Sequence, residues 1–217
     1  MMKKINLKSF NRLRKVIKII SAVVLLFSFT LQKTSAQNPL LDSLTLDTLA
    51  PYTSIDEALK HPEDVIKLDL RKKRLKKFPP EIFKFPNLQY LDLSKNDIKE
   101  IPVEIGQLKS LQYFAIFKNY VQELPPQIGG LTNLYYFDAD NNDLTSLPPE
   151  IGKLEKLKVL DLWSNDIGKF PDEIKNLKNL ISLDLRVIMI PDEEQARVQA
   201  LLPHTKVYFS PFCKCEQ

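Results

Sequence analysis

Apolar residues recur with a period of 23 residues between Val65 and Leu185. In rows of 23 that begin at Val65, the fourth and sixth positions are apolar in all six rows, whereas the position between them is aspartate in every row but one. An alternation of period two predicts a short, half-buried strand in each row. A strict period of this length indicates repeats that stack on their neighbours, so we expect one long sheet with one strand per row.

The second half of each row predicts a return of the chain behind the strand. An apolar residue followed by proline recurs there, as in Leu124-Pro125, and an isoleucine such as Ile128 follows three positions after the proline. Proline suits the first turn of a short helix because its missing N–H is not needed there. Gly106, Gly129 and Gly152 each follow the isoleucine, and we expect a left-handed backbone at these glycines.

One asparagine stands at the ninth position of four consecutive rows. These residues are Asn96, Asn119, Asn142 and Asn165. A side-chain amide offers two donors and an acceptor, enough to satisfy backbone groups at an inward turn. We therefore expect a buried structural ladder of asparagines rather than four surface turn residues. Lys73 and Ile188 occupy this position in the first and last rows, as expected for terminal repeats that differ from the rest.

The pattern resembles the leucine-rich repeat family in its 23-residue LxxLxLxxNxLxxLPxxIxxLxx form, found in Ras-group and plant disease-resistance-like repeats. The resemblance covers Val65 to about Leu185 and points to an exported bacterial member. It implies an α/β solenoid of about six repeats, with a curved parallel sheet on the concave side, short helical turns or loops on the convex side, and helical caps. In many relatives the concave side binds another protein.

Both ends of the repeat region carry cap signals. Ser54 and Glu57 form a capping box for a helix that covers the first repeat. Residues 191–202 predict an amphipathic helix with acidic residues in its first turn, and Val207 and Phe209 predict an incomplete seventh strand. The predicted organisation is a signal peptide at 1–36, a linker at 37–52, an N-terminal cap helix at 53–64, repeats at 65–187, a C-terminal cap at 188–212 and a tail at 213–217.

The first 36 residues have the layout of a secretory signal peptide. Basic residues precede an apolar run at 19–31, and small residues precede the cleavage point that we expect after Ala36. The run is shorter than the roughly 17 to 25 residues that span a membrane. We expect an exported, periplasmic or secreted protein with no membrane span after cleavage; anchoring by an uncleaved N-terminal segment is the alternative. Residues 1–36 hold eight basic and no acidic groups, so the remaining chain is acidic and composition does not support nucleic acid as a partner.

The third, fifth and seventh positions of each row face away from the predicted core, towards the concave side. We interpret seven of these residues as partner-binding: Tyr90, Tyr113, Phe117, Tyr136, Asp138, Trp163 and Arg186. Exposed aromatic residues are favoured anchors of protein interfaces, although cross-strand aromatic pairs also stabilise sheets. We expect a protein or peptide partner. The alternatives are carbohydrate binding, with Tyr113, Tyr136 and Trp163 as stacking platforms, and a structural role in the cell envelope.

The chemistry of an enzyme is not visible in the sequence. The repeat assembles no Ser-His-Asp arrangement and no glycine-rich phosphate loop, so we expect no catalytic residues and no cofactor. The aspartates at the fifth position could attract a cation, but calcium requires six to eight converging oxygens and a ladder supplies one per strand. Cys213 and Cys215 offer two thiolates, fewer than a structural zinc site needs. We therefore expect no metal site.

Overall fold

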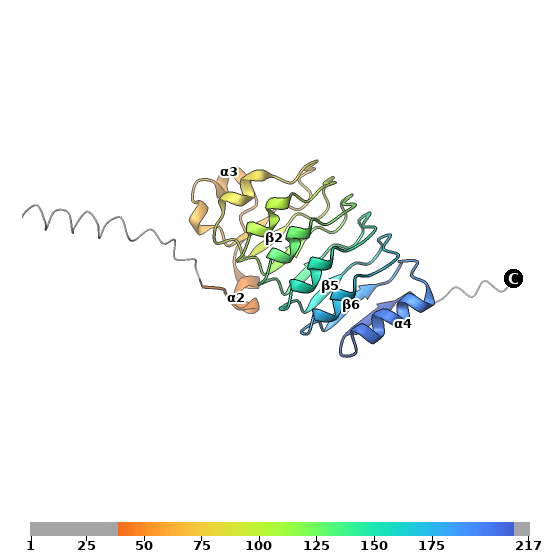
Figure 1. The fold of residues 1–217 in the computed structure, drawn as a ribbon. Helices are drawn as coiled ribbons and strands as arrows, with labels where there is room; N and C mark the ends of the chain where they lie inside the picture. The colour runs from red at the N-terminus through yellow and green to blue at the C-terminus, as the bar shows by residue number, and fades with distance from the viewer. Residues whose placement is uncertain (1–38, 211–217) are drawn as a thin grey trace, which may run out of the picture. The chain divides into compact units, whose positions relative to one another are not determined.

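The computed structural model describes residues 39–210, which form one sheet of seven parallel strands in chain order (Figure 1). The strands are β1 (Lys67–Asp69), β2 (Tyr90–Asp92), β3 (Tyr113–Ala115), β4 (Tyr136–Asp138), β5 (Val159–Asp161), β6 (Ser182–Leu185) and β7 (Lys206–Phe209). From β1 to β6, each strand residue pairs with the equivalent residue of the next row, as Leu68 does with Leu91. The predicted α/β repeat solenoid is confirmed.

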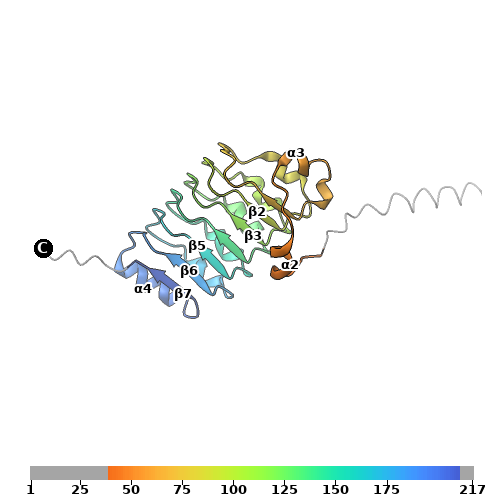
Figure 2. The same cartoon turned by 180° about the vertical axis from the view of Figure 1, so that it is seen from behind.

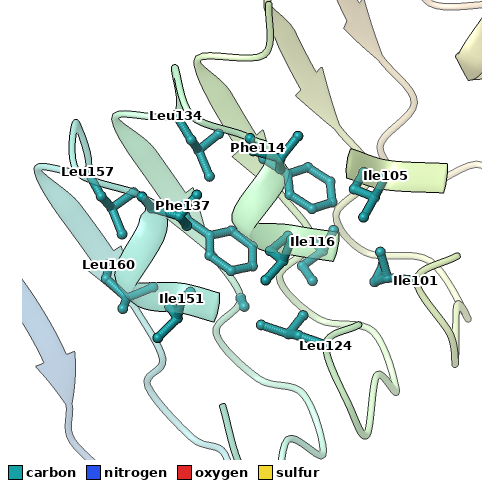
Figure 3. Packing of buried hydrophobic residues seen from close by; sticks show 14 of the residues in the cluster. Ile101, Ile105, Phe114, Ile116, Leu124, Leu134, Phe137, Ile151, Leu157 and Leu160 are labelled. Atoms are coloured by element: carbon teal, nitrogen blue, oxygen red, sulfur yellow. The ribbon is translucent and has the colours of Figure 1, made fainter. Parts of the chain in front are cut away.

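Short 3-10 helices form a second layer behind the sheet (Figure 1). They are η2 (Pro80–Lys84), η3 (Val103–Gln107), η4 (Pro126–Gly130), η5 (Pro149–Lys153) and η6 (Asp172–Asn176). The core lies between the two layers, where Phe114 and Phe137 are fully buried and lie near Ile105 and Ile151 of the 3-10 helices (Figure 3). Each repeat buries one face of its strand only by packing on its own helical turn and on its neighbours.

The glycines serve a different purpose from the one that the sequence predicts. None of the described glycines has a positive φ, so the expectation of a left-handed backbone at Gly106, Gly129 and Gly152 is wrong. A Cβ atom at Gly129 would lie 2.6 Å from the carbonyl oxygen of Glu150, and one at Gly106 would lie 2.7 Å from that of Gln127. Glycine is required because consecutive 3-10 helices approach each other closely.

Left-handed backbone recurs at the eighth position of each row, two or three residues after the strand ends. These residues are Lys72, Lys95, Lys118, Asn141, Ser164 and Val187, with φ values between 48° and 59°. The asparagine ladder follows them. Asn119 accepts the Ile98 N–H (3.0 Å) and donates to the carbonyl oxygens of Leu93 (3.1 Å) and Ile116 (2.8 Å). Each asparagine is 4–6% exposed, and its amide joins its own turn to the turn of the preceding repeat.

The segment expected to be a linker is folded where the structure describes it. Helix α2 (Ser43–Thr48) begins at Asp42, whose carboxylate accepts the Thr45 N–H at 3.0 Å, and Leu46 of this helix is fully buried. Tyr52 then forms a parallel bridge with Leu68 and so covers the edge of β1. The sequence of the segment itself did not predict this packing because the hydrogen bonds that join it to the repeats are made by its backbone groups.

The N-terminal cap helix is shorter than expected. Helix α3 (Ile55–Ala58) is a single turn, and η1 (Pro62–Asp64) follows it. Ser54 is the N-cap residue, but its side chain makes no capping hydrogen bond, so the predicted capping box does not form. Glu57 instead accepts hydrogen bonds from Lys60 Nζ at 2.8 Å.

The C-terminal cap matches the predicted helix and seventh strand. Helix α4 (Asp192–Leu201) carries three acidic residues in its first turn, and β7 pairs with β6. Glu194 accepts the Phe170 N–H at 2.8 Å and pairs with Arg197 at 2.7 Å, which fastens α4 to the last complete repeat. The predicted signal peptide and both cysteines lie outside the described residues. Within 39–210, no helix has the length and apolar character needed to cross a membrane.

Candidate functional site: the strand face

The strand face is the side of the sheet opposite the 3-10 helices (Figure 2). The parallel register places Tyr90, Tyr113 and Tyr136 side by side on it. Their rings stack with centroid distances of 4.1 and 4.5 Å and interplanar angles of 6° and 2°. On the core side, the equivalent rings of Phe114 and Phe137 lie 5.4 Å apart. Equivalent side chains are thus closer on the strand face than in the core, as expected if this face is concave.

The tyrosine stack presents ring edges and hydroxyl groups rather than ring faces. Both faces of Tyr113 are covered by its neighbours, and Lys67 Nζ lies 4.6 Å from the centroid of the Tyr90 ring. Burial raises the pKa of Tyr90 and of Tyr136 to about 12 and also raises the pKa of Tyr113, which neighbouring tyrosines raise further. The hydroxyls therefore remain protonated at neutral pH and can donate hydrogen bonds.

Two further aromatic residues stand at the seventh position. Phe117 and Trp163 are both half-buried, and Lys95 Nζ lies 5.1 Å from the centroid of the Phe117 ring. Within residues 39–210 neither ring stacks on another aromatic side chain, so the structure brings the three tyrosines together but leaves these two rings separate. Arg186, at the seventh position of the last row, is exposed and pairs with Asp184 at 2.6 Å.

The aspartates at the fifth position have a structural role. Each accepts the backbone N–H of the residue two positions later, as Asp92 does from Ser94 (2.9 Å) and Asp161 does from Trp163 (3.0 Å). Such a bond holds the start of the tight turn after the strand. Arg71 balances part of the charge in the first rows, at 2.5 Å from Asp69 and 3.3 Å from Asp92.

The centre of the strand face gathers three acidic side chains, whose charge Lys95, Lys118 and Arg186 balance only in part. Oxygens of Asp138, Asp140 and Asp161 lie within 4.8 Å of one another, and in the described part of the chain none of these three forms an ion pair. Burial, and after it the charges of the neighbouring Asp140 and Asp161, raise the pKa of Asp138 to about 7. Burial also raises the pKa of Asp161. The same carboxylates contribute to the raised pKa of Tyr136, so this acidic centre lies beside the tyrosine stack.

Two glutamines at the second position of their rows were not among the predicted site residues. Gln89 accepts the Leu41 N–H at 2.9 Å and donates to the Pro39 carbonyl at 3.2 Å. Gln112 donates to the Leu41 carbonyl and to Gln89 Oε1, both at 2.9 Å. Lys67 Nζ donates to the carbonyls at the end of α2 at 3.1 Å. Residues 39–48 therefore form an N-terminal strap beside β1 to β3, and the repetition of glutamine in consecutive rows was the available sequence signal.

Comparisons with known proteins agree with this architecture. The family profile described as "Leucine-rich repeat region" matches residues 65–144, and "Leucine Rich Repeat" matches residues 156–177. A leucine-rich repeat protein from Leptospira interrogans is 33% identical, with a TM-score of 0.60 over 75% of this chain and 49% of that chain. The plant peptide hormone receptor RGFR1, solved in complex with RGF2, is 31% identical, with a TM-score of 0.54 over 61% of this chain and 22% of that chain.

Internalin C2 from Listeria monocytogenes shares the fold at 24% identity, with a TM-score of 0.56 over 70% of this chain and 64% of that chain. No curated protein matches the chain in sequence. The parallel sheet, the 3-10 helices and the asparagine ladder define a repeat solenoid, and the family matches identify its kind: the chain is a leucine-rich repeat protein. It spans about half the length of the Leptospira protein.

Proposed function

We propose that this protein is a non-enzymatic interaction module that binds a protein or peptide partner through the strand face. The observation that carries the proposal is the stack of Tyr90, Tyr113 and Tyr136, which aims three ring edges and three protonated hydroxyls away from the core. The sheet holds these groups in one register, so little side-chain freedom is lost when a partner binds. Phe117 and Trp163 supply further apolar contact area on the same face.

The geometry favours a peptide over a sugar as the ligand of the tyrosine stack. Sugar rings pack on open aromatic faces, whereas both faces of Tyr113 are covered. Tyrosine hydroxyls can donate to the carbonyl groups of an extended peptide. The acidic centre formed by Asp138, Asp140 and Asp161 favours a partner with basic residues. The solved complex of the plant peptide hormone receptor RGFR1 with RGF2 supports a protein or peptide ligand as the class to test first.

The dimensions of the strand face limit the affinity. Seven strands spaced about 4.8 Å apart span roughly 30 Å, and strands of three or four residues are narrow. Such a surface alone buries less than the roughly 800 Å² per partner of a standard interface. The N-terminal strap also occupies the edge beside β1 to β3. We therefore expect modest affinity unless the partner also contacts the loops.

Affinity capture from an envelope extract tests the proposal. The test variant carries Tyr136→Ala and Trp163→Ala, and the control variant carries Tyr120→Ala and Val103→Ala, two exposed residues outside the strand face. Circular dichroism should show that both variants are folded. We expect only the test variant to lose the specifically captured proteins. Equal capture by both variants would contradict the proposal, and a loss of retention on polysaccharide columns instead would support the carbohydrate alternative.

We further propose that the protein acts after export. The proposal rests on the basic residues, the apolar run and the small residues of positions 1–36. Sequencing the N-terminus of the protein recovered outside the cytoplasm should give a chain that begins at Gln37. An intact Met1 would contradict cleavage and would support retention of the N-terminal segment as an anchor.

A further inference from the structure

Six of the seven residues from Arg71 to Lys77 are basic. This basic run follows β1 and forms the loop of the first repeat. Without residues 1–36 the chain is acidic as a whole, so the run opposes the overall charge. The corresponding loop of the second repeat carries Lys95 and Lys99 but also Asp97 and Glu100. The concentration of positive charge is therefore a property of the first repeat and not of the repeat pattern.

The fold fixes the backbone of the basic run. Lys72 and Arg74 adopt left-handed φ values of 58° and 57°. The Lys73 N–H and the Leu75 N–H both donate to Asn96 Oδ1, at 2.9 and 3.1 Å. The asparagine ladder thus holds this loop to the second repeat, and the cationic side chains project from a rigid backbone. A ligand that binds them does not have to order the loop.

The positive charge of the run is almost entirely uncompensated. Of the basic residues in this run, all of which lie in the described part of the chain, only Arg71 forms ion pairs, and the other five are exposed. Like charges at this density repel each other and contribute nothing to packing. A charged group that the fold does not need is a candidate for binding an oppositely charged partner.

Two hollows have walls made from this run. One, of about 580 Å³, is lined by Lys76, Lys77 and Lys99 over apolar groups that include Phe78 and Ile101, and Glu100 also borders it. The other, of about 380 Å³, is lined by Arg71, Lys72, Lys73 and Lys95 together with Thr53 and Asp69. The residues of a single loop therefore contribute cationic walls to two separate cavities.

We propose that the basic run and its two hollows form a second binding site, distinct from the strand face, for a linear polyanion that carries phosphate or sulfate groups. One anionic group occupies each hollow, and the linking segment of the polymer crosses the run between them. Two discrete hollows fit separate anionic groups on a polymer better than they fit the flat surface of a membrane. The site offers no exposed aromatic ring on which nucleic acid bases could stack, so backbone charge, not base identity, decides binding.

The test measures binding of inorganic polyphosphate and of heparin to the full chain. The patch variant carries Lys72→Gln, Lys73→Gln, Lys76→Gln and Lys77→Gln. The control variant carries Lys153→Gln, Lys169→Gln, Lys175→Gln and Lys178→Gln, which are exposed lysines of later repeats. Both variants lose four positive charges, and the basic residues of 1–36 are common to all three proteins. We expect the patch variant to bind at least tenfold more weakly than the wild type and the control variant to bind within about threefold of it.

Two supporting readouts separate a site from general charge attraction. The dependence of affinity on salt should be shallower for the patch variant, because fewer lysines contact the polymer. Its melting temperature should not fall, because the substitutions remove repulsion and no packing. Equal weakening in both variants would overturn the proposal. Binding to anionic phospholipid vesicles but to neither polymer would also overturn it in favour of a membrane surface.

Discussion

Replacement of one ladder asparagine by alanine is predicted to leave one buried hydrogen-bond donor without its only partner. Asn142 accepts the Val121 N–H at 3.0 Å and donates to three carbonyl oxygens at 3.1 Å. Those carbonyls keep other donors, namely Asn119 for Ile116, Asn165 for Ala139 and the Lys118 N–H for Asp140. Val121 is fully buried, and an unsatisfied buried donor costs about 1–3 kcal/mol. Asn142→Ala should therefore lower the free energy of unfolding by about 1–3 kcal/mol.

Asn142→Asp sharpens this prediction. Aspartate can still accept the Val121 N–H, but its second oxygen replaces the donor that faces three carbonyl oxygens. At pH 7 the Asn142→Asp protein, which contains a buried and unpaired carboxylate, should be less stable than the Asn142→Ala protein. It should recover part of the lost free energy of unfolding in acid, when the carboxylate is protonated. Urea denaturation at both pH values measures the effects, with the exposed Asn176→Ala as control. An Asn142→Ala protein within about 0.5 kcal/mol of the control would refute the buried ladder.

Two further predictions concern charge and packing. Burial raises the pKa of Asp138 from 3.8 to about 7 in the folded state. The stability that this group contributes is therefore fully present below about pH 4 and is lost as the pH rises through 7. In urea denaturation, Asp138→Asn should be more stable than the wild type at pH 8 and equal to it below about pH 4, and a less stable variant at pH 8 would contradict this. Gly129→Ala should cost about 1–3 kcal/mol because its Cβ would meet the Glu150 carbonyl. Gly168→Ala, which meets nothing within 4 Å, should change thermal unfolding little; equal effects of the two glycine variants would contradict close packing of the 3-10 helices.

The sequence was sufficient to predict the features that the 23-residue period determines. Strand positions and the outward row of Tyr90, Tyr113 and Tyr136 follow from a register in which equivalent residues pair. The seventh strand lies outside this period, since Ser182 pairs with Lys206 at an offset of 24 residues, and its prediction rested on Val207 and Phe209 alone. Parallel pairing of identical rows has one natural alignment, because a shift by one residue would bury the polar positions. The stacked geometry of the tyrosines is a direct consequence of this register.

The contacts that the period does not control were missed or misread. The N-terminal strap is held mainly through its own backbone by Gln89, Gln112 and Lys67, and backbone groups are the same in every sequence. Gly129 suits both a left-handed turn and a close approach, and only the structure separates these two reasons. The aspartates appeared as a row of surface charges, whereas each is bonded to its own turn, as Asp92 is to Ser94.

Site-specific photo-cross-linking tests the central claim, binding of a partner through the strand face, most directly. A photoreactive amino acid replaces Trp163 on the strand face in one protein and Val103 in η3, on the other side of the sheet, in a second protein. We predict a discrete protein adduct from position 163, suppressed by excess unlabelled wild type, and none from position 103. An adduct from position 103 with none from position 163 would contradict the claim.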